Sequence, residues 1–236
     1  MAKREPYKGD CFEEMPDREV ILLEDFIGIF DNALEPRACD ELIQVFKAFQ
    51  GEGKTMDRLQ AEKTPRDQKD DEAMGLYGPF IKCPETNEMY INEYVPFGRL
   101  FDSIYNCCHE YTAKWSLLPH ATHVGGGAYK IQKTEAGQGY HVWHAEAASH
   151  QPNRVLVWTA YLNDIDETAG GETEFLYYRH KCRPKKGRIM IWPAQFTHAH
   201  RGATYWGKEP KMIATGWLHY RDGCNVQVMN EDKKNG

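Results

Sequence analysis

The sequence predicts an α+β fold, in which a sandwich-like or barrel-like sheet carries helices on its outside. Two segments with apolar residues at helical spacing lie before about residue 124. After that point the chain changes to short runs of β-branched and aromatic residues, separated by Gly, Pro, Asn and Asp. With 236 residues, the chain has the size of a single domain (1–236) with a sizeable core.

Composition limits the class of protein and of partner. Hydrophobic residues make up 41% of the chain and aromatic residues 12%, which is typical of a folded protein. A net charge of −6 disfavours a nucleic-acid partner, and no apolar run has the length of a membrane span or the pattern of a signal peptide. Seven cysteines without a CxxC pair predict a reduced, cytoplasmic protein. The sequence does not indicate an oligomeric state.

The first half of the chain is expected to be rich in helix. Residues 1–18 are polar and predict a loosely held lead-in. The run 19–30 has the β-branched and aromatic residues of a strand. Helices are expected over 38–49, just after a proline, and over 99–115. We therefore expect a helix-rich N-terminal part over residues 19–123.

The stretch 54–72 is strongly charged, and Met56 and Leu59 are its only large apolar residues. We interpret residues 60–72 as a solvated surface connector. The alternative interpretation is a lid that orders over a bound substrate.

The second half is expected to contain a β-rich core over residues 124–220, followed by a tail over 221–236. Its predicted strands are 128–134, 154–163, 173–178, 188–192 and 211–220.

Two histidine-containing motifs in this β-rich part indicate a metal site. His144 and Glu146 are two residues apart, so on a strand both side chains lie on one face. On a helix they would point about 200° apart, and the flanking Tyr140 and Trp143 favour the strand. A second motif, FTHAHRG at 196–202, supplies another imidazole. Two imidazoles and one carboxylate are the protein ligands of non-haem Fe(II) oxygenases.

Either His198 or His200 can supply that second imidazole, because both are expected to face inward at a spacing of two. A cation follows in the last predicted strand, where Lys211 begins a face that is otherwise formed by Ile213, Thr215 and Trp217. A buried, uncompensated cation is costly. A dicarboxylate ligand would compensate it through charge-assisted hydrogen bonds.

Taken in order, the motifs resemble a known family. The series YhvWHxE, R-x(6)-YLND, GGET-x-F, PKKG, HxHRG and G-x(3)-K-x-IATGW is similar to the prolyl-4-hydroxylase-like group of Fe(II)/2-oxoglutarate-dependent dioxygenases. The resemblance covers roughly residues 126–220, and is strongest to the short forms of bacterial and phage genomes. It implies a double-stranded β-helix, or jelly-roll, core with flanking N-terminal helices.

The resemblance also implies roles for individual residues. His144, Glu146 and His200 match the metal ligands, and Arg201-Gly202 after His200 favours it over His198. The residues implied to bind 2-oxoglutarate are Lys211, Tyr161 and, as a weaker match, Thr173.

Three features depart from the family pattern. The carboxylate is Glu146 rather than the commoner aspartate. Thr134 stands where the family often has a tyrosine, so one expected co-substrate contact is either absent or supplied by Tyr129. The spacing from His200 to Lys211 is one residue longer than usual, which predicts a small bulge in the intervening turn. The residues considered for substrate binding or for support of the metal ligands are Arg154, Trp217, Thr134 and Tyr129.

The implied activity is hydroxylation of a C–H bond, coupled to conversion of 2-oxoglutarate to succinate and CO2. The implied cofactors are Fe(II), 2-oxoglutarate and O2, with ascorbate as a stimulant. A prolyl residue in a peptide or protein is the first candidate substrate. A free amino acid or metabolite is an alternative, and so is a non-catalytic metal-binding jelly roll or sensor.

Overall fold

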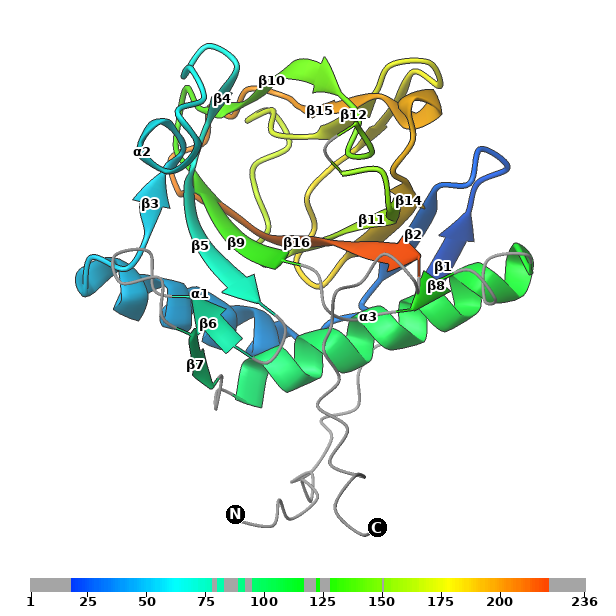
Figure 1. Cartoon of the computed structure of the whole chain (residues 1–236), viewed down its shortest axis with the longest axis horizontal. Helices are drawn as coiled ribbons and strands as arrows, with labels where there is room; N and C mark the ends of the chain where they lie inside the picture. The colour runs from blue at the N-terminus through cyan, green and yellow to red at the C-terminus, as the bar shows by residue number, and fades with distance from the viewer. Residues whose placement is uncertain are drawn as a thin grey trace, which may run out of the picture.

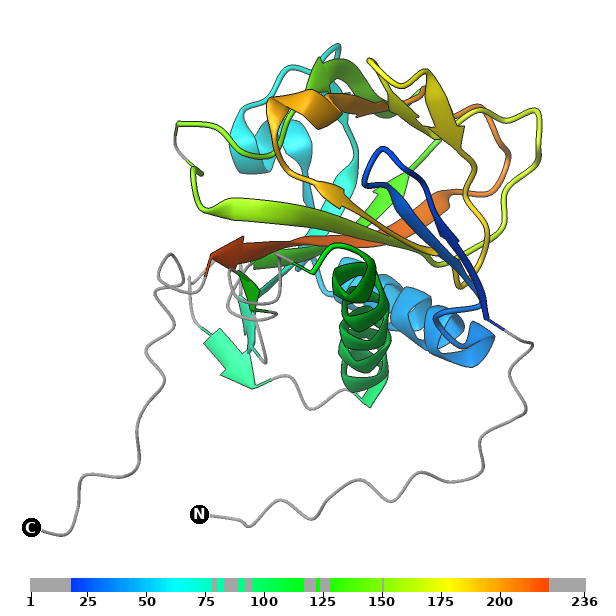
Figure 2. The same ribbon diagram turned by 90° about the vertical axis from the view of Figure 1, so that its right-hand side faces the viewer.

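Two antiparallel sheets face each other, and two long helices cover the outer side of the larger sheet (Figures 1 and 2). The computed structural model describes residues 18–77, 80–82, 89–91, 95–116, 122–123, 128–149 and 151–220. The predicted tail 221–236 and all but the last residue of the predicted lead-in 1–18 lie outside these residues.

The larger sheet has the strand order β1-β2-β14-β11-β16-β9-β5-β6-β7, with β3 paired to β5 and β8 paired to β16. Its strands are β1 (Glu19–Leu22), β2 (Gly28–Asp31), β3 (Met56–Asp57), β5 (Glu72–Tyr77), β6 (Phe80–Lys82), β7 (Met89–Ile91), β8 (Thr122–His123), β9 (Ala128–Thr134), β11 (Arg154–Tyr161), β14 (Ile189–Pro193) and β16 (Lys211–Tyr220).

The smaller sheet has the order β13-β12-β15-β10-β4. Its strands are β4 (Lys69–Asp70), β10 (Gly139–His144), β12 (Thr173–Phe175), β13 (His180–Cys182) and β15 (His200–Gly202). From β9 to β16 the chain passes repeatedly between the two sheets, which is the arrangement of a double-stranded β-helix. The predicted α+β fold with a jelly-roll core is therefore confirmed.

The two long helices are α1 (Pro36–Gly51) and α3 (Val95–Lys114), and both match predicted helices. In α1, the proline occupies the first turn, where its missing N–H costs nothing. Leu42 and Phe46 of α1 and Leu100 and Ile104 of α3 are buried against the larger sheet. Within the described residues, no helix has the length and apolar character needed to span a membrane.

Alternation along the strands divides the larger sheet into a core face and a cavity face. On β11, Leu156 and Trp158 belong to the core beneath the helices, whereas Val157 and Thr159 face the smaller sheet. The core face is tightly packed around Gly216 of β16, where an added Cβ would lie 2.5 Å from the Tyr129 ring.

The predicted strand over 19–30 is in fact a hairpin of β1 and β2. The chain turns at residues 23–27, where Phe26 adopts a left-handed conformation with φ of 62°. A hydrogen bond from the N–H of Leu23 to the carbonyl of Ile27 closes this turn. The charged pair Glu24-Asp25 lies within this turn and interrupts the apolar run.

The prediction of a solvated connector over 60–72 is only partly correct, because residues 63–68 are mostly exposed but both flanks belong to regular structure. The segment begins within α2 (Arg58–Glu62), which Asp57 caps by accepting a hydrogen bond from the N–H of Gln60, and it includes the strand β4, which pairs with β10. The helix-rich description of residues 19–123 is also incomplete, because this part supplies strands to both sheets.

A buried charge network explains how so charged a segment is ordered. Arg58 Nε donates to Asp71 Oδ1 at 2.8 Å, and both side chains are almost fully buried. The amide of Gln132 donates to Asp71 Oδ2 at 2.7 Å, which connects the segment to β9. From the sequence, these charged residues suggest a solvated loop, but in the structure they are buried because they pair with each other.

Candidate metal and co-substrate site

A cavity with a volume of about 410 Å³ lies between the two sheets. Its walls come from β9, β11, β14 and β16 of the larger sheet and from β4, β10, β12 and β15 of the smaller one. The inward face predicted for the last strand is confirmed, since Lys211, Ile213, Thr215 and Trp217 all line the cavity.

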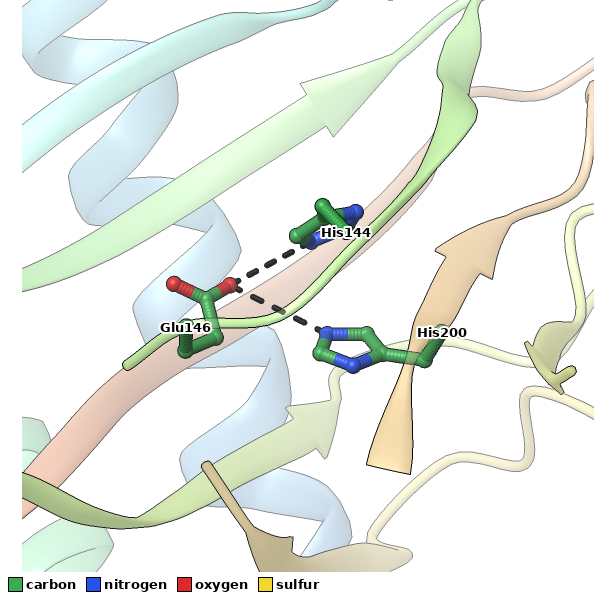
Figure 3. Close-up of side chains that lie close together, drawn as sticks. All are labelled: His144, Glu146 and His200. Carbon is green, nitrogen blue, oxygen red and sulfur yellow. Dashed lines mark ion pairs between the residues drawn. The ribbon is translucent and has the colours of Figure 1, made fainter. Parts of the chain in front are cut away.

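His144, Glu146 and His200 converge in this cavity (Figure 3). Their candidate ligand atoms all lie within 4.8 Å of one another. Glu146 Oε1 is 3.4 Å from His144 Nε2 and 3.8 Å from His200 Nε2. The three groups therefore present two imidazole nitrogens and one carboxylate oxygen to a common point.

The backbone explains how the three residues meet. His144 is the last residue of β10 and pairs directly with His200, the first residue of β15. Glu146 lies just beyond β10, so the expectation that His144 and Glu146 share one strand is only half correct. The N–H groups of Glu146 and Ala147 donate to the carbonyl of Ala194, which holds the chain beyond the strand against the end of β14.

The two histidines of the cluster share one hydrogen-bonding pattern. His144 Nδ1 is 3.1 Å from the carbonyl oxygen of Val142, and His200 Nδ1 is 2.9 Å from that of His198. With a proton on Nδ1, each ring donates to its carbonyl and leaves the lone pair of Nε2 directed at the common point. At His200, Trp192 Nε1 also lies 3.3 Å from Nδ1.

His198, the competing candidate, is engaged elsewhere. It ends the short 3-10 helix η1 (Phe196–His198), and its Nε2 is 2.6 Å from the carbonyl oxygen of Asp25. Of the two histidines, His200 is therefore the one that the structure brings to the cluster.

The ionisation states in the cluster suit a cation. Burial lowers the pKa of His200 to about 4, so its imidazole is neutral at pH 7. Burial alone would raise the pKa of Glu146, but the hydrogen bond and charge interaction with His144 bring this pKa well below its ordinary value. A neutral imidazole and an ionised carboxylate are the forms that bind metals.

The second oxygen of Glu146 is held by two donors. Trp217 Nε1 donates to Oε2 at 2.9 Å, and Arg154 Nη1 donates to the same oxygen at 3.0 Å. The Arg154 guanidinium lies over the Trp217 ring, 3.6 Å from its centroid. This clamp fixes the long glutamate side chain with only Oε1 directed towards the two histidines.

We expect the Trp217→Phe substitution to weaken metal binding about 10- to 100-fold, the range found for hydrogen-bond partners of metal ligands. Phenylalanine retains an aromatic ring beneath Arg154 but loses the indole N–H that holds Glu146. Titration with Mn(II), followed by the loss of the free-ion EPR signal, measures the effect. The control is Trp206→Phe, at an exposed tryptophan. Equal affinities in the two variants would show that the clamp does not support the ligand.

A buried lysine marks another part of the cavity. Lys211 Nζ donates to the carbonyl of Gly171 at 2.9 Å. Gly171 has φ of +78°, and a Cβ at this position would lie 3.3 Å from Lys211 Cδ, so the GGET turn leaves room for the lysine. Within the described part of the chain, no carboxylate oxygen lies within 4.0 Å of this ammonium. Burial lowers the pKa of Lys211 to about 8.

Two hydroxyl groups line the same cavity. Tyr161 OH and Thr173 Oγ1 are 2.7 Å apart, on β11 and β12. Burial raises the pKa of Tyr161 well above its ordinary value, so its hydroxyl remains protonated and able to donate.

The suggestion that Tyr129 replaces the missing family tyrosine is wrong. Thr134, at the end of β9, pairs with Lys211 and lines the cavity. Tyr129 is five positions earlier and lies on the opposite face, where its ring packs against those of Phe101 and Trp158.

Sequence reasoning missed several cavity residues. Lys130 and Gln132 share the face of Thr134, so the two-residue period of β9 contained the signal for them. Lys69 and Asp71 enter the cavity only because β4 pairs with β10, and no local pattern indicated that pairing.

The fold and the site together are those of a jelly-roll protein with a candidate site for one metal ion among the described residues. Residues 129–219 match the family model of the 2OG-Fe(II) oxygenase superfamily. No curated protein sequence matches the chain. The matched region contains His144, Glu146 and His200, and it supports a 2-oxoglutarate-dependent Fe(II) dioxygenase that uses Fe(II), 2-oxoglutarate and O2.

Solved structures of prolyl hydroxylases are similar to the chain in fold. The enzyme from Pseudomonas putida aligns with a TM-score of 0.63 at 12% identity, covering 83% of this chain and 94% of that one. The viral collagen prolyl hydroxylase from Paramecium Bursaria Chlorella virus-1 aligns with a TM-score of 0.55 at 18% identity, covering 83% of this chain and 96% of that one. A prolyl hydroxylase from Trichoplax adhaerens, in complex with a hypoxia inducible factor peptide, aligns with a TM-score of 0.61 at 13% identity. The alignment covers 83% of this chain and 84% of that one.

Proposed function

We propose that the protein hydroxylates a prolyl residue in a peptide or protein, with Fe(II) held by His144, Glu146 and His200. The donor set fits this metal, because two imidazoles and a carboxylate on one side leave the other coordination positions open. When bound, Fe(II) and 2-oxoglutarate supply the oxidising chemistry, in which O2 is consumed and succinate and CO2 are released. The convergence of the three side chains inside a jelly roll is the observation that carries the proposal.

The cavity also fits the co-substrate. In the proposed complex, Lys211 binds the distal carboxylate of 2-oxoglutarate, and the hydroxyls of Tyr161 and Thr173 donate hydrogen bonds to it. The carboxylate supplies the counter-charge that the lysine lacks within the described protein. Charge-assisted hydrogen bonds of this kind are about twice as strong as neutral ones.

The protein's own part in the reaction is to hold and orient the metal ligands. The Arg154–Trp217 clamp keeps Glu146 in a single orientation, and the Nδ1 hydrogen bonds of His144 and His200 fix both rings. The apolar side chains of Val157 and Ile213 line the cavity beside these polar groups and limit the water in it.

A peptide substrate is supported by the shared fold with prolyl hydroxylases, one of which is described in complex with a peptide. We also propose a cytoplasmic location and stimulation by ascorbate. Cys39, Cys107, Cys108 and Cys182 are free and buried, in keeping with a reducing compartment.

A screen for succinate release tests the substrate class. Proline-containing peptides, the same peptides with alanine in place of proline, and free amino acids are each incubated with Fe(II)-loaded protein and 2-oxoglutarate. We expect succinate formation to rise with the proline peptides alone, and mass spectrometry to place one added oxygen on proline. A response limited to free amino acids would contradict the peptide proposal and favour the small-molecule alternative.

A further inference from the structure

Lys69 brings another largely buried cation into the cavity, from a part of the chain outside the β-rich half. It lies in β4, at the edge of the smaller sheet, where it pairs with Tyr140 of β10. The Lys69 ammonium is 4.2 Å from the centroid of the Tyr140 ring. That ring stacks on the imidazole of His144, with centroids 3.6 Å apart. Lys69 therefore reaches the neighbourhood of the metal ligands.

Among the described residues, the positive charge of Lys69 has no carboxylate within hydrogen-bonding distance. Its side chain is 14% exposed, and the single ion-pair contact is to Asp71 Oδ2 at 3.9 Å, beyond hydrogen-bonding distance. Asp71 is already engaged, since Arg58 binds one of its oxygens and Gln132 the other. Arg58 balances the charge of Asp71, so Lys69 remains an excess cation.

The two arginines of the cavity provide a contrast. Arg154 pairs with Glu146 at 3.0 Å, and Arg201 pairs with Glu174 at 2.7 Å. Lys69 and Lys211, by comparison, line the cavity from opposite sheets without such a partner. Burying a cation without a partner costs free energy, which an anionic ligand would recover. Burial lowers the pKa of Lys69 to about 8, as it does for Lys211.

We propose that Lys69 binds a carboxylate in the cavity, at a place distinct from the carboxylate assigned to Lys211. The assignment of the distal carboxylate of 2-oxoglutarate to Lys211 rests on the proposed function. The excess charge at Lys69 is independent of that function. The carboxylate has two possible sources. It is either the C1 carboxylate of 2-oxoglutarate, close to the metal, or a carboxylate of the substrate, which would define an acidic substrate class.

The test compares Lys69→Met with Lys63→Met, an exposed position of the same segment. Mn(II)-loaded proteins are titrated calorimetrically with 2-oxoglutarate and with 2-oxopentanoate, which lacks the distal carboxylate. If Lys69 binds the C1 carboxylate, Lys69→Met weakens both acids about 10- to 100-fold, as expected for a lost hydrogen bond to a charged group. Lys63→Met should match the wild type.

A second titration identifies a substrate carboxylate. N-acetylproline and N-acetylprolinamide are added to the Mn(II)–2-oxoglutarate complex. If Lys69 binds the substrate, the wild type prefers the acid, Lys69→Met loses the preference, and the affinity for 2-oxo acids is unchanged. Lys69→Arg should restore part of the lost binding in either case, and Lys69→Gln serves as a second neutral variant if the methionine variant does not fold.

Unchanged affinity of the neutral variants for all four probes would overturn the proposal for Lys69 and leave the proposed function intact. Wild-type protein that binds N-acetylproline through Lys69 but does not bind 2-oxoglutarate would overturn the proposed function alone. Wild-type protein that binds none of the acids would overturn both.

Discussion

His200→Ala is expected to abolish metal-dependent activity and to weaken metal binding by more than about 100-fold, beyond the usual effect of losing a mere hydrogen-bond partner of a ligand. The substitution removes one of the three donor atoms that converge in the cavity. Glu146 and His144 remain, but two protein ligands hold a divalent ion far less tightly than three. Mn(II) titration measures the affinity, and succinate release with Fe(II) measures the activity.

His198→Ala provides a closely matched control. This histidine is two residues earlier and is also buried, but its Nε2 contacts the carbonyl of Asp25 rather than the cluster. We expect it to lower the free energy of unfolding by about 1–3 kcal/mol through the lost hydrogen bond, with metal affinity retained. Loss of metal binding in His198→Ala and its retention in His200→Ala would reverse our assignment of the third ligand.

Lys211→Met is expected to have opposite effects on the free and the liganded protein. Burial lowers the pKa of Lys211 from 10.5 to about 8, which corresponds to roughly 3 kcal/mol of unfavourable free energy for the charged form in the empty cavity. Methionine removes this cost, so the ligand-free variant should unfold at a higher temperature than the wild type. The same substitution removes the proposed partner of the distal carboxylate, so 2-oxoglutarate should no longer raise the unfolding temperature.

Thermal unfolding of the Mn(II)-loaded protein, with and without 2-oxoglutarate, measures both effects. Lys208→Met, at an exposed lysine in the turn before β16, is the control and should behave as the wild type. If 2-oxoglutarate stabilises Lys211→Met as much as the wild type, the lysine does not bind the co-substrate. If the ligand-free variant is less stable than the wild type, Lys211 is not a buried excess charge.

The site residues on regular strands were predictable because the side-chain period of a strand is two. That period placed Lys211 and Trp217 on one inward face, and it brought His144 close to Glu146 even though the strand ends between them. The same rule would have prevented the error with Tyr129. An odd separation from Thr134 places the two side chains on opposite faces of β9.

The rest of the site depends on contacts between distant segments. Sequence alone gave no indication that β4 pairs with β10, and this pairing brings Lys69 into the cavity. Arg58 and Asp71 are charged residues that suggest solvent exposure, and only their mutual pairing allows both to be buried. The hairpin of β1 and β2 had a visible signal, since the charged pair Glu24-Asp25 interrupts the apolar run at its turn. Charge and hydrophobicity patterns describe the preference of each residue by itself, whereas strand pairing and buried ion pairs depend on two residues that are distant in the sequence.

In the proposed complex, His144, Glu146 and His200 hold one Fe(II) together with 2-oxoglutarate. The most direct measurement is an anaerobic titration of the metal-free wild-type protein with Fe(II) and 2-oxoglutarate, followed by visible absorption, with succinate assayed after O2 is admitted. We predict a weak charge-transfer band that requires both additions and saturates at one Fe(II) per chain, followed by succinate formation. The absence of this band, together with no succinate under O2, would show that the three residues do not form an iron site of this kind.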